Sequence, residues 1–148
     1  MIKAWHLYFF LGLCLSACNR CKDGCLNGVC VDNYCDCDVW YAGDQCDRSE
    51  LSVYEGNYSG TFSLNASWET VSFSLVSNSE EPSKLTAEGL NLMFHFTSLT
   101  RFDVPDQSWK NQMWQGEGEM LLDLVSIRLV STDSTGVREG LLEAYREE

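Results

Sequence analysis

Proline and basic residues are both scarce in this chain, which has two prolines and ten lysines and arginines. Two prolines are too few for a proline-rich linker or a low-complexity segment, so long disorder is not expected. Acidic residues number 22, and the formal net charge is −12. Because phosphate binding requires clustered Lys and Arg, this balance argues against nucleic acid as a partner and against electrostatic adhesion to an anionic bilayer.

Long hydrophobic runs are missing, except near the N-terminus. Residues 4–15 (AWHLYFFLGLCL) form a twelve-residue apolar run, which is shorter than the roughly 20 residues of a membrane-spanning helix and has the length of a signal-peptide core. Leu15-Ser16-Ala17-Cys18 follows and resembles the lipobox of bacterial lipoproteins. The resemblance implies that residues 1–17 are a cleaved signal peptide and that residues 18–20 are an N-terminus anchored through acylated Cys18. An ordinary signal peptide and an uncleaved anchor are the alternatives.

The cysteine count favours the lipobox. Of eight cysteines, Cys14 leaves with the signal peptide and Cys18 takes the lipid, which leaves an even set of six. An ordinary signal peptide would leave seven, with one free thiol in an oxidising compartment. The six all lie between Cys21 and Cys46, a density that indicates a disulfide-stabilised scaffold. Spacing alone allows fifteen connectivities. A zinc site is the rival interpretation, but the segment has no histidine.

Residues 21–47 resemble an EGF-like domain. The pattern is Cys21-x3-Cys25-Leu-Asn-Gly28-Val-Cys30-x4-Cys35-x-Cys37-x5-Gly43-x2-Cys46. The resemblance implies three disulfides, Cys21–Cys30, Cys25–Cys35 and Cys37–Cys46, a turn at Gly28, and a positive φ at Gly43. Trp40 departs from it, because Gly or Pro commonly precedes the aromatic residue, here Tyr41. The carboxylates of calcium-binding modules are absent ahead of Cys21, so no metal and no cofactor are expected.

The spacing places this module close to the membrane. Only Asn19 and Arg20 separate Cys18 from Cys21, and three residues reach at most about 10 Å. The module is therefore expected at the bilayer surface, either as a spacer or as a partner-binding module.

The remainder of the chain, after a short linker at 48–52, predicts an antiparallel β domain over residues 53–148. Thr70–Ser77 alternates apolar and small polar residues, and Leu90, Leu92, Phe94 and Phe96 share one face. The predicted fold class is all-β: a disulfide-rich module followed by a meander that forms a sandwich or a small barrel. A helix within 106–114 or 118–126 is the alternative. Expected strands cover 54–64, 70–77, 90–97, 113–120, 121–130 and 137–145, with turns at 79–83 and 131–136 and a loop or strand end at 101–107.

The whole arrangement resembles small Bacteroidota-type lipoproteins that join a lipobox, one EGF-like module and a β domain. In these the β domain opens with Tyr-x-Gly-x-Tyr-x-Gly, here residues 54–60. The resemblance implies an outer-membrane location and leaves the biochemical role undefined.

Residues for catalysis are few. The mature chain keeps one histidine, His95, and it has no free thiol, no Gly-x-Ser-x-Gly elbow and no phosphate loop. A sheet-face position is expected for His95, and a Ser-His-Asp relay is its functional alternative. Glu117 and Glu119 form the best carboxylate pair, roughly 7 Å apart on one strand face, which suits a glycosidase. A solvated polar face is the simpler interpretation.

Three functions remain open. The first is a non-catalytic membrane-anchored lipoprotein whose β domain binds a protein or a glycan. The second is a lipocalin-like barrel that holds an apolar ligand, and the third is a hydrolase using Glu117 and Glu119. An enclosed cavity favours the second and a filled core favours the first. Trp68, Trp109 and Trp114 could stack on sugars or line a cavity, although at least two of them are expected to be structural.

One modification signal lies in the predicted turn at 131–136. The triplet Asp133-Ser134-Thr135 resembles the short O-glycosylation signal of Bacteroidota envelope proteins, with Ser134 as acceptor. An unmodified Asx or Ser turn is the alternative.

Overall fold

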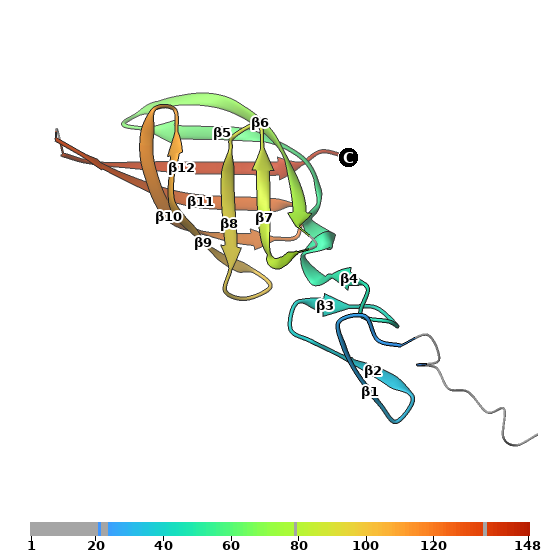
Figure 1. The fold of residues 1–148 in the computed structure, drawn as a ribbon. Helices are drawn as coiled ribbons and strands as arrows, with labels where there is room; N and C mark the ends of the chain where they lie inside the picture. The colour runs from blue at the N-terminus through green and yellow to red at the C-terminus, as the bar shows by residue number, and fades with distance from the viewer. Residues whose placement is uncertain (1–20, 22–23, 79, 135) are drawn as a thin grey trace, which may run out of the picture. The chain divides into compact units, whose positions relative to one another are not determined.

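The computed structural model describes residues 21, 24–78, 80–134 and 136–148 (Figure 1). The predicted signal peptide and Cys18 lie outside the described residues. The chain divides into two compact units, one ending at Arg48 and the other covering Ser49–Glu148. The fold is all-β with three disulfides in the N-terminal part, as the sequence predicts.

The N-terminal unit contains two short antiparallel sheets. Strands β1 (Gly28–Val31) and β2 (Tyr34–Cys37) form a hairpin, and β3 (Tyr41–Ala42) pairs with β4 (Arg48–Ser49) at the unit's end. The hairpin turn is Asp32–Asn33, where φ is +49° and +68°. Positive φ at both central residues is the geometry of a type I′ turn, which matches the twist of two paired strands.

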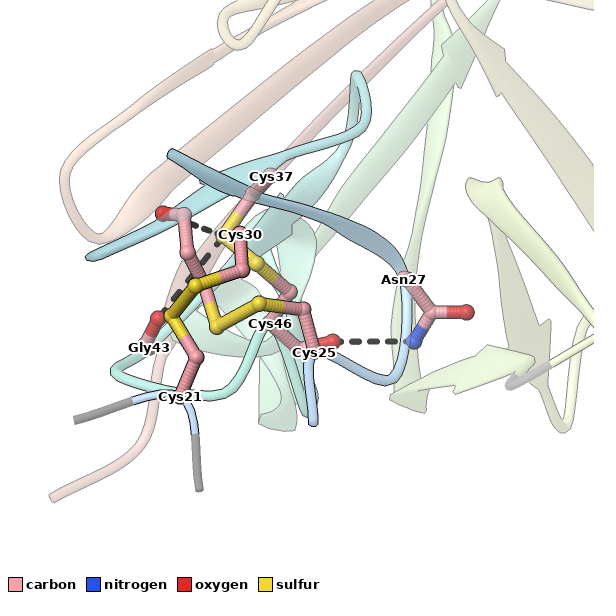
Figure 2. The surroundings of a disulfide bond; sticks show 8 residues. Cys21, Cys25, Asn27, Cys30, Cys37, Gly43 and Cys46 are labelled. Atoms are coloured by element: carbon pink, nitrogen blue, oxygen red, sulfur yellow. Dashed lines mark hydrogen bonds between the residues drawn. A yellow bond between two sulfur atoms is a disulfide. The ribbon is translucent and has the colours of Figure 1, made fainter. Parts of the chain in front are cut away.

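Disulfides hold this unit together. The structure joins Cys21 to Cys30, Cys25 to Cys35 and Cys37 to Cys46, the same pairing that the EGF-like resemblance implies. Figure 2 shows Asn27 beside them, with its side-chain amide donating to the carbonyl oxygen of Cys46 at 2.9 Å. The unit thus replaces a large apolar core with cross-links and backbone contacts.

Three residues of this unit were singled out from the EGF-like pattern: Gly28, Gly43 and Trp40. Gly28 is not in a turn: it begins β1, where a Cβ would lie 2.3 Å from the carbonyl oxygen of Asp36. Glycine is therefore needed for the close approach of two strands. Gly43 has φ of +101°, as predicted, and Trp40 takes φ of +76°. This left-handed backbone explains why glycine suits the position that Trp40 occupies.

The second unit is a closed antiparallel barrel in which each strand pairs with the next and the last pairs with the first (Figure 1). A 3-10 helix, η1 (Glu50–Tyr54), leads into it, with the hydroxyl of Ser49 accepting from the Leu51 N–H. The strands are β5 (Gly56–Leu64), β6 (Ser67–Asn78), β7 (Glu81–Glu88), β8 (Leu92–Phe96), β9 (Arg101–Trp109), β10 (Gln112–Leu121), β11 (Leu124–Asp133) and β12 (Gly136–Arg146).

Several local predictions are corrected. The expected linker at 48–52 is β4 and the start of η1, and β5 begins at Gly56 instead of Tyr54. Residues 81–83, predicted as a turn, begin β7, a strand that the sequence did not indicate. Residues 101–107 belong to a full strand, and the helix alternatives at 106–114 and 118–126 are wrong because β9, β10 and β11 occupy these residues. Pairing with neighbouring strands overrides weak local preference.

Both prolines lie at irregularities of the ladder. The register between β6 and β7 shifts between Ser77 and Asn78, opposite Pro82, and that between β9 and β10 shifts between Trp114 and Gly116, opposite Pro105. A bulge tolerates proline because the missing N–H is not needed by the neighbouring strand. The prediction of a loop or strand end at 101–107 therefore gave Pro105 too much weight as a strand breaker.

Alternation along the strands fills the barrel interior. The shared face of Leu90, Leu92, Phe94 and Phe96 is buried, as predicted. Aromatic rings contact one another inside, with ring centroids 4.7 Å apart for Phe62 and Trp109 and 4.6 Å apart for Phe94 and Phe102.

Candidate functional site

Side chains fill the centre of the barrel, so no ligand-sized space lies beside them. Among the described residues, many interior side chains have no surface that a water molecule can reach, either from outside or from an internal void: Tyr58, Leu85, Ala87, Leu92, Phe94, Met120, Val125, Ile127, Leu129, Leu142 and Ala144. Eight-stranded barrels either fill their interior with side chains or hold one small ligand. These side chains follow the first pattern.

Two polar side-chain groups of this core, on Tyr58 and Trp114, have structural partners. The Tyr58 hydroxyl donates to the carbonyl oxygen of Tyr54 at 3.0 Å, and burial raises the pKa of the phenol. The Trp114 indole N–H donates to the carbonyl oxygen of Trp109 at 3.1 Å. Both contacts satisfy donors that burial would otherwise leave unpaired, so neither group is offered to a ligand.

The three barrel tryptophans differ in exposure. Trp109 and Trp114 are 7% and 1% exposed and both contact Phe62, so they are core residues, as predicted for at least two of the three. Trp68 is 74% exposed and lies on β6. It pairs with Ser63 of β5, which places its side chain on the outer face of the barrel.

Glu117 and Glu119 also lie on the outer face. Both line an open groove of about 480 Å³, together with Asp103 and Arg128. The Glu119 carboxylate lies 3.4 Å from the Arg101 guanidinium, and both side chains are more than half exposed. The two glutamates therefore share a groove, as a hydrolase would require. Both glutamates are exposed to solvent.

Arg128 also lines two further hollows, of about 330 and 660 Å³. We call the three hollows that share Arg128 the Arg128 groove. Its defining residues follow one cross-strand row, in which Asp103 pairs with Glu117, Glu117 with Arg128, Arg128 with Leu141, and Leu141 with Ser63. Trp68 is the next residue of that row.

Arg128 forms an ion pair within the groove. Its Nη2 lies 2.9 Å from Oε2 of Glu139 on β12. This hydrogen bond and the nearby Glu139 charge raise the pKa of Arg128, so the guanidinium stays charged. Sequence analysis did not single out Arg128 or Glu139. The alternation of Arg128 with apolar Ile127 and Leu129 marks its outward direction, but cross-strand neighbours are not visible from one strand.

His95 is a partly exposed residue on β8 that pairs with Lys84 and Asp103. Its Nε2 lies 3.4 Å from the sulfur of Met93. A sheet-face position for this histidine, the expected one, is confirmed.

Ser134 is exposed in the turn between β11 and β12. The neighbouring Asp133 carboxylate lies 3.2 Å from the guanidinium of Arg138. The turn is shorter than the predicted 131–136, because β11 runs to Asp133 and β12 begins at Gly136. Thr135, the third residue of the predicted glycosylation signal, lies outside the described residues.

Three sulfur atoms lie close together in the N-terminal unit. Those of Cys21, Cys25 and Cys35 are within 4.8 Å of one another. Each is bonded in a disulfide, so none is a thiolate that could ligate zinc.

Comparisons with protein-family models, curated proteins and solved structures find no match to this chain. Across the residues that the structure describes, no helix has the length and apolarity needed to cross a membrane.

Proposed function

We propose that this chain is a non-catalytic, membrane-anchored lipoprotein of the bacterial cell envelope, and that its barrel binds a protein or glycan through its outer surface. The filled barrel interior is the observation that supports binding through the outer surface. If the interior holds no ligand, recognition must use the outside, where the Arg128 groove and Trp68 lie. The exposed carboxylates Glu117 and Glu119 then serve as polar groups of a binding surface.

The N-terminal unit acts in this proposal as an EGF-like spacer on an acylated Cys18. The disulfide pairing and the Cys35-x-Cys37 spacing support it. Each buried methylene of an acyl chain contributes about 0.8 kcal/mol, so two or three chains give lasting attachment. The location that follows is the outer membrane, facing the periplasm or the exterior.

Anchoring is tested by Cys18→Ser in the native host. We expect the variant to lose fatty-acid labelling and to leave the membrane fraction, while Cys14→Ser, which changes only the signal segment, keeps both. A Cys18→Ser protein that still incorporates fatty acid would disprove the lipobox assignment.

The lipocalin-like alternative has the closed eight-stranded barrel in its favour. Native mass spectrometry of the protein extracted from its host separates the two functions. We expect the mass of the lipidated polypeptide, with any covalent glycan, and no non-covalent apolar ligand. A stoichiometric apolar molecule released on unfolding would contradict the outer-surface proposal.

A further inference from the structure

The exposure of Trp68 is the first observation that points to a ligand. The indole is 74% exposed, although it belongs to a regular strand and not to a mobile loop tip. Its cross-strand neighbour Ser63 is small, and the Ser63 hydroxyl donates to the carbonyl oxygen of Leu141 at 3.3 Å. No bulky side chain of β5 therefore covers this side of the ring. A flat aromatic surface is left facing solvent.

A hollow next to Ser63, the cross-strand partner of Trp68, has the size of a small-ligand site. The hollow that Ser63 lines has a volume of about 330 Å³ and also contacts Arg128, Glu139 and Leu141. Sites for small ligands begin at about 300 Å³. This hollow shares Arg128 and Leu141 with the part of the groove that holds Glu117, so a chain of linked units could span both.

The polar groups of the groove suit hydroxyl groups. Glu139 contacts one nitrogen of Arg128, and a guanidinium has five N–H donors in a fixed plane. Carboxylate acceptors lie on both neighbouring strands: Glu117 is the partner of Arg128 on β10, and Glu139 lies on β12, two residues from Leu141, the other partner of Arg128. Donors and acceptors thus alternate over a short distance, which matches the neighbouring hydroxyls of a sugar ring. The C–H face of such a ring stacks on an indole.

The charge of the groove and the extent of its apolar surface narrow the class of ligand further. Carboxylates outnumber guanidinium groups in the Arg128 groove, because Asp103, Glu117, Glu119 and Glu139 face only Arg101 and Arg128. An acidic sugar would be repelled by this excess. A folded protein partner requires about 800 Å² per side with an apolar centre, whereas the exposed apolar side chains of this row are Trp68 and Leu141.

We infer that the Arg128 groove and Trp68 together bind a neutral glycan, with the indole stacking on one sugar ring and Arg128, Glu139 and Glu117 bonding to hydroxyls. This inference rests on the proposed outer-surface binding function and names its site and ligand class.

The test probes the full-length lipoprotein, solubilised in detergent, with arrayed neutral oligosaccharides and, in parallel, acidic oligosaccharides and peptides. We expect binding to at least one neutral oligosaccharide and none to the acidic ones. Trp68→Ala and Arg128→Gln should each weaken that binding roughly tenfold or more, because contacts at the centre of a site dominate affinity. Thermal unfolding should change little in both, since the two positions are exposed.

Tyr145→Ala is the matched control. Tyr145 is 62% exposed on β12 and pairs with Ser59, four residues along β5 from the partner of Trp68. It should bind as the unmodified protein does. Absence of neutral-glycan binding, or binding that survives Trp68→Ala, would overturn the inference. Trp68-dependent binding to peptides alone would also overturn it and would leave outer-surface binding and the anchor at Cys18 intact.

Discussion

Gly140 lies on β12 opposite the space that the Phe62 ring occupies. A Cβ at this position would meet Cε2 and Cζ of Phe62 at 2.5 and 2.6 Å. Phe62 is 3% exposed and also contacts Trp109 and Trp114. The ring therefore occupies the volume that glycine leaves empty, an arrangement that compensates for glycine within a sheet.

We expect Gly140→Ala to destabilise the barrel by about 1–3 kcal/mol, because the added methyl group overpacks the Phe62 ring. Phe62→Leu should also destabilise it, through lost ring contacts. The double variant should lose less than the sum of the two, since leucine leaves room for the methyl group. Chemical denaturation of the unmodified protein, the two single variants and the double variant gives the free energies of this double-mutant cycle. An interaction energy between the two positions below about 0.5 kcal/mol would contradict the proposed contact between Gly140 and Phe62.

Ser134 has the accessibility that a modifying enzyme needs. It is exposed in a tight turn, and the hairpin of β11 and β12 that carries this turn extends well beyond β7 and β8 (Figure 1). A transferase acting on folded protein requires such a hydroxyl, and a bulky glycan is tolerated at the surface.

The predicted modification is tested by intact mass in the native host. We expect a mass above that of the lipidated polypeptide, with the excess lost in Ser134→Ala and in Asp133→Asn. Ser72→Ala, at an exposed serine without a preceding aspartate, should keep the excess. An unmodified mass, or a glycan that persists in Ser134→Ala, would exclude this site.

At the scale of elements, the seam between β8 and β9 has the fewest paired residues among the described strand pairs of the barrel. The two strands pair only at His95 with Asp103 and at Phe96 with Phe102. Further along, the Gln107 side chain replaces the missing strand contacts. Its Oε1 accepts from the Met93 N–H at 2.7 Å, and its Nε2 donates to the Met93 carbonyl oxygen at 2.9 Å. One side-chain amide thus takes the place of a backbone peptide.

We expect Gln107→Ala to destabilise the barrel by about 1–3 kcal/mol, because both backbone groups of Met93 lose their partner. Hydrogen exchange should accelerate at the Met93 amide, while the β11–β12 ladder keeps its protection in the native state. Gln115→Ala is the matched control, since Gln115 is exposed on β10 and should change neither quantity. Unchanged exchange at Met93 in Gln107→Ala would contradict this role.

At the scale of the whole molecule, the barrel has its own apolar core and does not depend on a disulfide, so we expect it to fold alone. Residues 49–148 contain no cysteine, and several contacts at the barrel entry join residues within this range. Ser49 is the N-cap of η1, and its hydroxyl donates to the carbonyl oxygen of Pro82. The Arg146 guanidinium donates to the carbonyl oxygens of Val53 and Glu55. The boundary therefore lies at Ser49, earlier than the predicted Val53.

We expect the fragment 49–148 to unfold cooperatively and to keep a β-type circular dichroism spectrum in reducing buffer. A fragment that starts at Val53 should be less stable, because it lacks Leu51, which is fully buried, and the Ser49 contacts. A disordered 49–148 product would mean that the two units depend on each other for stability.

The sequence by itself determined features that depend on local spacing. Six cysteines within a short segment indicate a cross-linked unit, because so few residues cannot bury a core. Alternation of period two assigned Leu92, Phe94 and Phe96 to one buried face, because successive side chains of a strand point to opposite sides. A strand such as β7 was missed, since its proline and charged residues hide a pairing that neighbouring strands impose.

Only the tertiary structure decided how the strands close and which side chains meet. Trp68, Trp109 and Trp114 are alike as residue types, yet ring packing buries two of them and the outer face exposes the third. The Arg128 groove joins residues from β5, β9, β10, β11 and β12, and their neighbourhood depends on hydrogen-bond register across those strands. Register is set by turns, bulges and the burial of one face together, so no single strand of the sequence contains it.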